Sequence, residues 1–221
     1  WISAVEIEDI LATFEPPNEY EVAQRLLRQN GVILLCGVAG GGKRAAAIHL
    51  CAQLRGADGN RALCELSPDL RLVDLSLDDI PNCSGIVLET PTGLALDGLI
   101  RTRMQSLRTA LSERDSALVI TCEHLPPAVE QDSRSLMVNW NPTWPQGHCE
   151  AQRQILARHL RRAGDRAGMA ANDLEPALAA LMEEAELVST LSVPLEMKEL
   201  ADLAYYVFPV IQGNAGLLPS L

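Results

Sequence analysis

The chain has 221 residues, of which 48% are hydrophobic and 21% are charged, and its mean hydropathy is +0.06. This length and apolar content exclude a disordered chain and allow one large domain or a domain with a smaller companion. Aromatic residues make up only 4%, so aliphatic side chains must fill the core, which favours helices and parallel strands over an aromatic-rich β-sandwich. The formal net charge of -11 repels nucleic acid and anionic membranes and argues against both as partners.

The cysteines and the ends of the chain indicate where the protein works. The six cysteines show no CxxC pair and no regular spacing, which predicts buried thiols in a reducing compartment. The chain begins at Trp1 without a leader-like segment, so we expect a domain excised from a longer cytoplasmic protein. The apolar stretch 203–218 is interrupted by Pro209, which argues against a membrane-spanning helix.

The first two thirds of the chain alternate short apolar runs with helical patterns. Strands are expected at 31–36, 62–66, 86–88, 117–122 and 136–140. Helices are expected at 18–29, 43–54 and 94–112. Strands that alternate with helices at this spacing predict an α/β fold, in which a parallel sheet carries helices on both faces.

The pattern changes at a proline-marked segment. Pro142, Pro145 and Gly147 interrupt any regular element, which predicts an α/β core at residues 1–145 and a small all-helical, lid-like domain at residues 146–221. The expected helices of this second part are 149–163, 171–187 and 195–208. A break is expected at 164–167, and the last helix is expected to stop before Pro209.

A glycine-rich loop is the strongest functional motif. The segment from Gly37 through Gly40, Gly41 and Gly42 to Lys43 satisfies G-x-x-x-x-G-K, directly after a buried strand and before a helix. Glycines let backbone N–H groups wrap a phosphate, the helix N-terminus adds positive charge, and the lysine meets the β and γ phosphates. The motif predicts a P-loop, and the alternative is a glycine turn that binds nothing.

The position after the lysine departs from the P-loop pattern. A Ser or Thr hydroxyl there holds Mg²⁺, whereas this chain has Arg44, which has no acceptor atom. Either Arg44 turns outward and leaves a weakened site, or its guanidinium contacts phosphate and replaces part of the metal's charge. Mg²⁺ binding is therefore left open, and no other spacing of His and Cys indicates a metal site.

Two strand ends supply the remaining candidates. Glu89 follows the apolar run 86–88 and could orient water or hold Mg²⁺ through water, although acidic strand ends are also common for solubility. Thr121, near the end of the strand 117–122, is placed where a γ-phosphate sensor could lie, and its alternative role is structural.

These features together resemble a STAND-type P-loop NTPase, a member of the AAA-related signalling ATPases often found in bacterial conflict and immune-like systems. The resemblance rests on the lead-in 14–20, the strand 32–36, the loop 37–43, the Glu-tipped and sensor-position strands, and the helical domain. It implies ATP or ADP binding between core and lid, and a switch between closed and oligomeric states. Only Gly37, Gly42 and Lys43 match the family at motif level.

Departures from the family motifs predict impaired chemistry. Arg44 replaces the metal-binding hydroxyl, Glu89-Thr90 replaces an acidic pair, no arginine follows 117–122, and a Gly-x-Pro lid motif is missing. We therefore expect a nucleotide-binding regulatory module of a signalling or defence protein, with slow or absent hydrolysis. The alternative is an inert pseudo-NTPase scaffold for protein interaction or oligomerisation, and a phosphotransferase is a third class. The expected partners are flanking domains of the same polypeptide and a second copy of the chain.

Overall fold

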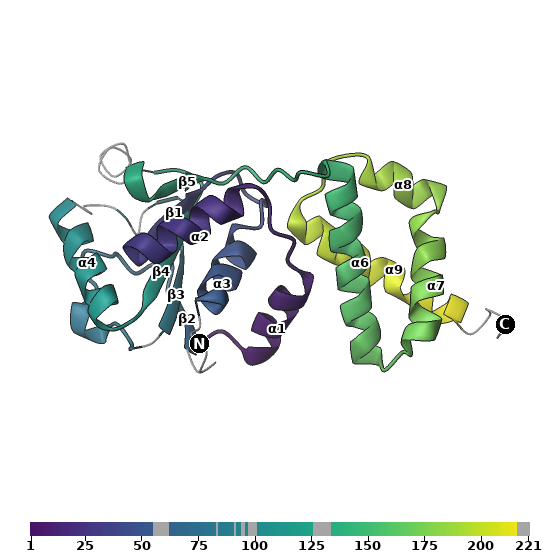
Figure 1. Cartoon of the computed structure of the whole chain (residues 1–221), viewed down its shortest axis with the longest axis horizontal. Helices are drawn as coiled ribbons and strands as arrows, with labels where there is room; N and C mark the ends of the chain where they lie inside the picture. The colour runs from purple at the N-terminus through teal and green to yellow at the C-terminus, as the bar shows by residue number, and fades with distance from the viewer. Residues whose placement is uncertain are drawn as a thin grey trace. The chain divides into compact units, whose positions relative to one another are not determined.

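The computed structural model describes residues 1–54, 62–82, 84–90, 92–93, 96, 101–125 and 134–215. The chain divides into two compact units. The first comprises Trp1–Leu11 and Pro16–Pro142, and the second comprises Ala12–Glu15 and Thr143–Leu221. Figure 1 shows the order of the elements along the chain.

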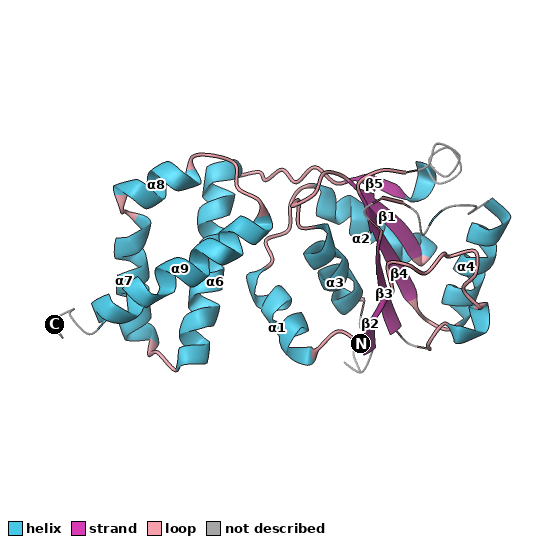
Figure 2. Ribbon diagram, turned by 180° about the vertical axis from the view of Figure 1, so that it is seen from behind, coloured by secondary structure: helices cyan, strands magenta, loops and turns pink. Residues whose placement is uncertain are grey.

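A parallel sheet forms the centre of the first unit, and it confirms the expected α/β class. Its strands are β1 (Val32–Cys36), β2 (Ala62–Leu66), β3 (Ser84–Glu89), β4 (Ala117–Cys122) and β5 (Met137–Asn139). They lie in the order β2-β3-β4-β1-β5, and every neighbouring pair is parallel (Figure 2). Because parallel strands share one direction, the ends of β1, β3 and β4 meet at one edge of the sheet.

Helices cover both faces of this sheet. The helices are α1 (Ala4–Thr13), α2 (Glu19–Asn30), α3 (Lys43–Gln53) and α4 (Arg101–Glu113). Helices α2 and α3 contact β1, β3 and β4, while α4 packs on the other face. The core on the α4 face joins aliphatic side chains from alternate strand positions to apolar side chains of α4. The strand residues include Val32, Leu34, Ile86, Leu88, Leu118 and Ile120, and the α4 residues include Leu107 and Leu111.

Several boundaries in the first unit differ from the sequence expectation. Helix α1 was not predicted, although its Ile7 is buried. The expected helix 94–112 is seen as α4 from Arg101 onward, and residues 94, 95 and 97–100 lie outside the described part of the chain. The last strand is shorter than 136–140, because a short 3-10 turn at Arg134–Leu136 precedes it.

The second unit is all-helical, as expected. Its helices are α6 (His148–Ala167), α7 (Ala171–Met182), α8 (Ala185–Leu191) and α9 (Met197–Ala215). They enclose their own apolar core, which includes Trp144, Ile155, Leu160, Leu174, Leu178, Leu187, Leu200 and Ile211. Within the described residues, none of the helices in either unit is long and apolar enough to cross a membrane.

Three predicted helix boundaries in the second unit are wrong. Helix α6 runs through the expected break at 164–167 because Gly164 allows close packing: a Cβ there would lie 2.6 Å from Leu174 Cδ2. The expected helix 171–187 is two helices, since the backbone at Glu184 is extended. Helix α9 continues through Pro209, because Leu200 and Ile211 on either side are buried and their packing outweighs the lost N–H.

Candidate functional site

The glycine loop has the backbone that its sequence predicts. It joins the end of β1 to α3, which begins at Lys43. Gly40 and Gly42 both have φ of 71°, a left-handed conformation that favours glycine. Gly42 is the N-cap of α3, and the first N–H groups of that helix have no intrahelical partner. The loop and the helix end therefore form a backbone suited to binding an anion.

Trp140, just beyond β5, holds the loop in place. Its indole is 1% exposed, and Nε1 donates a hydrogen bond of 2.7 Å to the Gly41 carbonyl. Gly37 packs against the Trp140 backbone so closely that a Cβ at Gly37 would lie 2.0 Å from the Trp140 carbonyl oxygen. Sequence reasoning assigned Trp140 only to a strand. The available signal was a tryptophan at a strand end in a chain with only three.

Lys43 folds back over the loop. Its Nζ donates to the carbonyl oxygens of Gly37, at 2.8 Å, and Val38, at 2.5 Å. Burial lowers the pKa of Lys43, and the nearby Glu123 opposes that shift more than any other group. Glu123 comes directly after β4, and Glu89 is the last residue of β3, so an acidic residue at a second strand end was the sequence signal for Glu123.

Glu89 and Thr121 are neighbours at the loop edge of the sheet. They are Cα partners on β3 and β4, and laterally paired residues point to the same face. Thr121 is 3% exposed, and its carbonyl oxygen accepts a 2.8 Å hydrogen bond from the Thr90 N–H. Burial raises the pKa of Glu89, while Arg44 acts in the opposite direction. The structure thus brings Glu89 to the same edge as Lys43, which the sheet order made possible.

Arg44 contacts a group of carboxylates. Its Nε and Nη2 donate to the two oxygens of Glu65 on β2, each at 3.0 Å, and Nη1 donates to Glu6 on α1. Nε also lies 3.5 Å from Glu89. The hydrogen bond to Glu65 is the main cause that raises the pKa of Arg44. The guanidinium is thus engaged with acids of the first unit, and its contact with phosphate stays a prediction.

Mg²⁺ does not fit this arrangement in the way that a P-loop usually holds it. Position 44 supplies a cation in place of a hydroxyl, and that cation lies beside Glu89, the nearest candidate ligand. Among the described residues, no three His, Cys, Asp or Glu side chains lie together as a metal ion would require.

The Arg44–Glu65 pair predicts a pH dependence of stability. Arg44 lowers the pKa of Glu65 below its value in the unfolded chain, so the pair stabilises the fold above that unfolded value. This stability is lost as the pH falls through the folded pKa. Because both side chains are 34% exposed, we expect a contribution of less than about 1 kcal/mol.

Chemical denaturation between about pH 5 and about pH 3 measures this contribution. The free energy of unfolding should fall less steeply with decreasing pH in Glu65→Gln than in the natural chain. Glu186→Gln, at an exposed position of α8, is the matched control and should keep the natural slope. Equal slopes for all three proteins would show that the pair contributes nothing.

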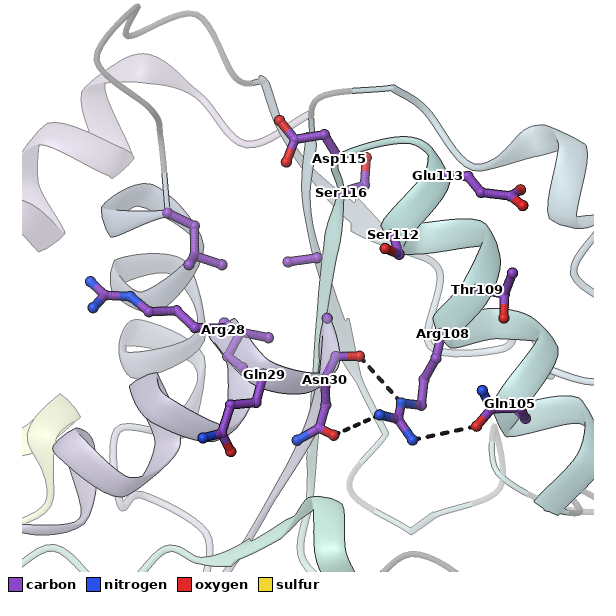
Figure 3. Close-up of a pocket in the computed structure, with 14 residues that line it drawn as sticks. Arg28, Gln29, Asn30, Gln105, Arg108, Thr109, Ser112, Glu113, Asp115 and Ser116 are labelled. Atoms are coloured by element: carbon purple, nitrogen blue, oxygen red, sulfur yellow. Dashed lines mark hydrogen bonds between the residues drawn. The ribbon is translucent and has the colours of Figure 1, made fainter.

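A separate cavity lies at the opposite edge of the sheet. Its volume is about 590 Å³, and it is lined where α2 ends and β4 begins. Arg108 belongs to α4, and its side chain reaches the end of α2, where Nη2 donates to Asn30 Oδ1 at 2.7 Å (Figure 3). Basic side chains such as Arg28 and acidic ones such as Asp115 both line it, so its residues favour no single ligand chemistry. The cavity takes no part in the loop site.

Comparisons with known proteins identify the fold. No protein-family model and no curated protein match the sequence. The structure of C. elegans PCH-2 is similar with a TM-score of 0.55 and 16% identity, over 95% of this chain and 67% of that one. AMPPCP-bound DnaA from Aquifex aeolicus is similar with a TM-score of 0.50 and 11% identity, over 89% of this chain and 64% of that one.

These similarities define the class of fold. This chain shares with PCH-2 and DnaA the AAA+ ATPase type of fold, a parallel α/β core followed by helices. The chain spans less than two thirds of the DnaA chain. Identities of 16% and 11% show a common fold and leave the activity to be argued from the site.

Proposed function

We propose that this chain is a nucleotide-binding regulatory module that holds ATP or ADP at the loop from Gly37 to Lys43. The observation that carries the proposal is the loop itself: left-handed Gly40 and Gly42 lead into the N-terminus of α3, with Lys43 folded over the loop carbonyls. The AMPPCP bound to the DnaA neighbour supports the choice of an adenine nucleotide. The protein that contains this module would be a STAND-like signalling or defence protein.

Each part of the loop has a role in this proposal. The backbone N–H groups around Gly42 would donate to phosphate oxygens, and Nζ of Lys43 would exchange the carbonyls of Gly37 and Val38 for a phosphate. Thr121 would act as a γ-phosphate sensor. Hydrolysis would be slow or absent, since Arg44 stands in place of the metal-binding hydroxyl and its Nε, 3.5 Å from Glu89, competes with water for that carboxylate.

A second function is an inert scaffold derived from the same fold. It is favoured by the Arg44 contacts, because Glu6, Glu65 and Glu89 already satisfy the cation that would otherwise face a nucleotide. Such a scaffold would mediate contacts with flanking domains of the same polypeptide or with a second copy in the cytoplasm. A measurement of nucleotide binding distinguishes the two functions, because only the regulatory module is expected to bind ATP or ADP.

Calorimetric titration of ATP and ADP into the chain, first with Mg²⁺ and then with EDTA, tests the proposal. We expect dissociation constants in the micromolar range that survive EDTA, because the site has no metal-binding hydroxyl. Lys43→Ala should weaken binding by about tenfold or more, since it removes a charge-assisted contact to phosphate. The control is Lys198→Ala, which removes the only other lysine, at an exposed position of α9.

The outcomes are distinct. Binding lost in Lys43→Ala and kept in Lys198→Ala supports a nucleotide site at the loop. Absence of heat and of any thermal shift with either nucleotide overturns it and leaves the scaffold function. Equal weakening in both variants also overturns it, because the effect would then not depend on the loop.

A further inference from the structure

Two cysteines meet at the base of the glycine loop. Cys36 is the last residue of β1 and Cys122 the last of β4, and the two are Cα partners in the parallel ladder. Their Sγ atoms lie 3.0 Å apart, within hydrogen-bond distance for thiols. Cys122 is fully buried, whereas Cys36 is only half-buried. Register and distance together place two sulfur atoms where a covalent bond needs only a short movement.

The surroundings distinguish the two thiols. The hydrogen bond with Cys36 and then burial raise the pKa of Cys122, which keeps this buried thiol protonated, while Cys36 is the more exposed of the two. Lys43 interacts electrostatically with both sulfur atoms, and an ammonium group favours a thiolate. The pair therefore combines a half-buried thiol at Cys36, beside a cation that favours its thiolate form, with a buried resolving thiol at Cys122.

We propose that Cys36 and Cys122 form a redox modification site, at which a peroxide converts the two thiols into an intramolecular disulfide. The Cys36 thiolate attacks one peroxide oxygen, the O–O bond breaks, and Cys36 becomes a sulfenic acid, while the departing hydroxide takes up the proton that Cys36 released and leaves as water. The Cys122 sulfur then attacks the Cys36 sulfur, the S–O bond breaks, and the departing hydroxide takes up the Cys122 proton and leaves as the second water. Two thiols are oxidised by two electrons, and one hydrogen peroxide is reduced to two waters. A dithiol reductant reverses the change.

The disulfide would act on the loop that begins at the next residue. The N–H of Gly37 donates to the Cys122 carbonyl at 3.1 Å, and the opposite side of Gly37 lies against the Trp140 backbone. A disulfide shortens the distance between the sulfur atoms to about 2.05 Å and draws the ends of β1 and β4 together. Gly37 has no room to absorb this movement. We therefore expect weaker nucleotide binding in the oxidised protein, an effect that rests on the proposed function.

Peptide mapping tests the modification site without reference to nucleotide. The full chain is reduced, treated with hydrogen peroxide, alkylated and digested with trypsin under non-reducing conditions. Trypsin releases each cysteine in a peptide of its own, residues 29–43 for Cys36 and residues 115–134 for Cys122. We expect these peptides joined, with a mass about 2 Da below their sum, because two thiol hydrogens have left. Cys36→Ser and Cys122→Ser should each abolish the product, whereas the control Cys149→Ser, in the second unit, should keep it.

Nucleotide titration of the reduced and oxidised chain tests the effect on the loop. We expect oxidation to weaken ATP binding by about fivefold or more, and a dithiol reductant to restore it. Failure to find the joined peptides overturns the modification site. Joined peptides with unchanged affinity overturn its effect on the loop. If the reduced chain binds no nucleotide, the proposed function fails, while the peptide map still decides the cysteine site.

Discussion

Replacing Trp140 with alanine is expected to lower the free energy of unfolding of the first unit by about 3–5 kcal/mol. The indole is 1% exposed, so its removal leaves a cavity that the sheet and the loop can fill only in part. The change also removes the indole Nε1–H, which donates a hydrogen bond of 2.7 Å to the Gly41 carbonyl and fixes the loop. We therefore expect the same variant to weaken nucleotide binding beyond its effect on stability.

Urea denaturation followed by far-ultraviolet circular dichroism measures the loss. Trp140→Phe keeps most of the ring and removes only the N–H, so it should cost less than alanine and should report the hydrogen bond, about 1 kcal/mol. Trp1→Ala is the matched control, because Trp1 is 80% exposed and its loss should change stability by no more than about 0.5 kcal/mol. If Trp140→Ala behaved like Trp1→Ala, the packing role of Trp140 would be refuted.

The elements around the loop could be predicted because their signals are local. The strand Ala117–Cys122 has the predicted bounds, since it is buried along its whole length and a buried parallel strand is a continuous apolar run. The edge strand Ala62–Leu66 also has the predicted bounds, although it is only partly buried. Helix α3 begins at the predicted Lys43, because the preceding glycines stop β1 and allow the left-handed turn at Gly42. Backbone preference and hydrophobic pattern agree at these positions.

The partners of the site residues could not be predicted, because they depend on the order of strands across the sheet. Arg44 reaches Glu65 because the strand order places β2 beside β3, and α3 packs against both of these strands. It also reaches Glu6 on α1, a residue 38 positions away in the sequence. Cys36 and Cys122 are 86 positions apart in sequence and become neighbours only when β1 pairs with β4. A single sequence shows the ends of strands and leaves their lateral order open.

The errors in the helical unit have the opposite cause, a local signal that tertiary packing overrides. Glycine and proline usually interrupt helices, which is why breaks were predicted at Gly164 and Pro209. Gly164 instead lies where Leu174 leaves no room for a Cβ, so its missing side chain serves the packing of α6 against α7. At Pro209 the buried residues on both sides retain the helix.

Replacing Gly37 with alanine should damage the site far more than the same replacement at Gly41 in the same loop. The added Cβ would lie 2.0 Å from the Trp140 carbonyl oxygen and 2.9 Å from its carbonyl carbon. These are backbone atoms, which cannot rotate away as a side chain can, so β1 and the segment after β5 must separate. We expect a loss of about 3 kcal/mol or more in the free energy of unfolding, together with loss of nucleotide binding.

Gly41→Ala is the matched control, since it adds the same methyl group to the same loop. A Cβ there meets its nearest atom, the Val38 carbonyl oxygen, at 3.5 Å, which is an ordinary contact. Its free energy of unfolding should therefore differ from that of the natural chain by no more than about 1 kcal/mol. A Gly37→Ala variant as stable as Gly41→Ala would mean that the end of β1 and Trp140 can move apart at little cost. The loop would then not be held by β5, and the expected coupling between the Cys36–Cys122 pair and the loop would lose its physical basis.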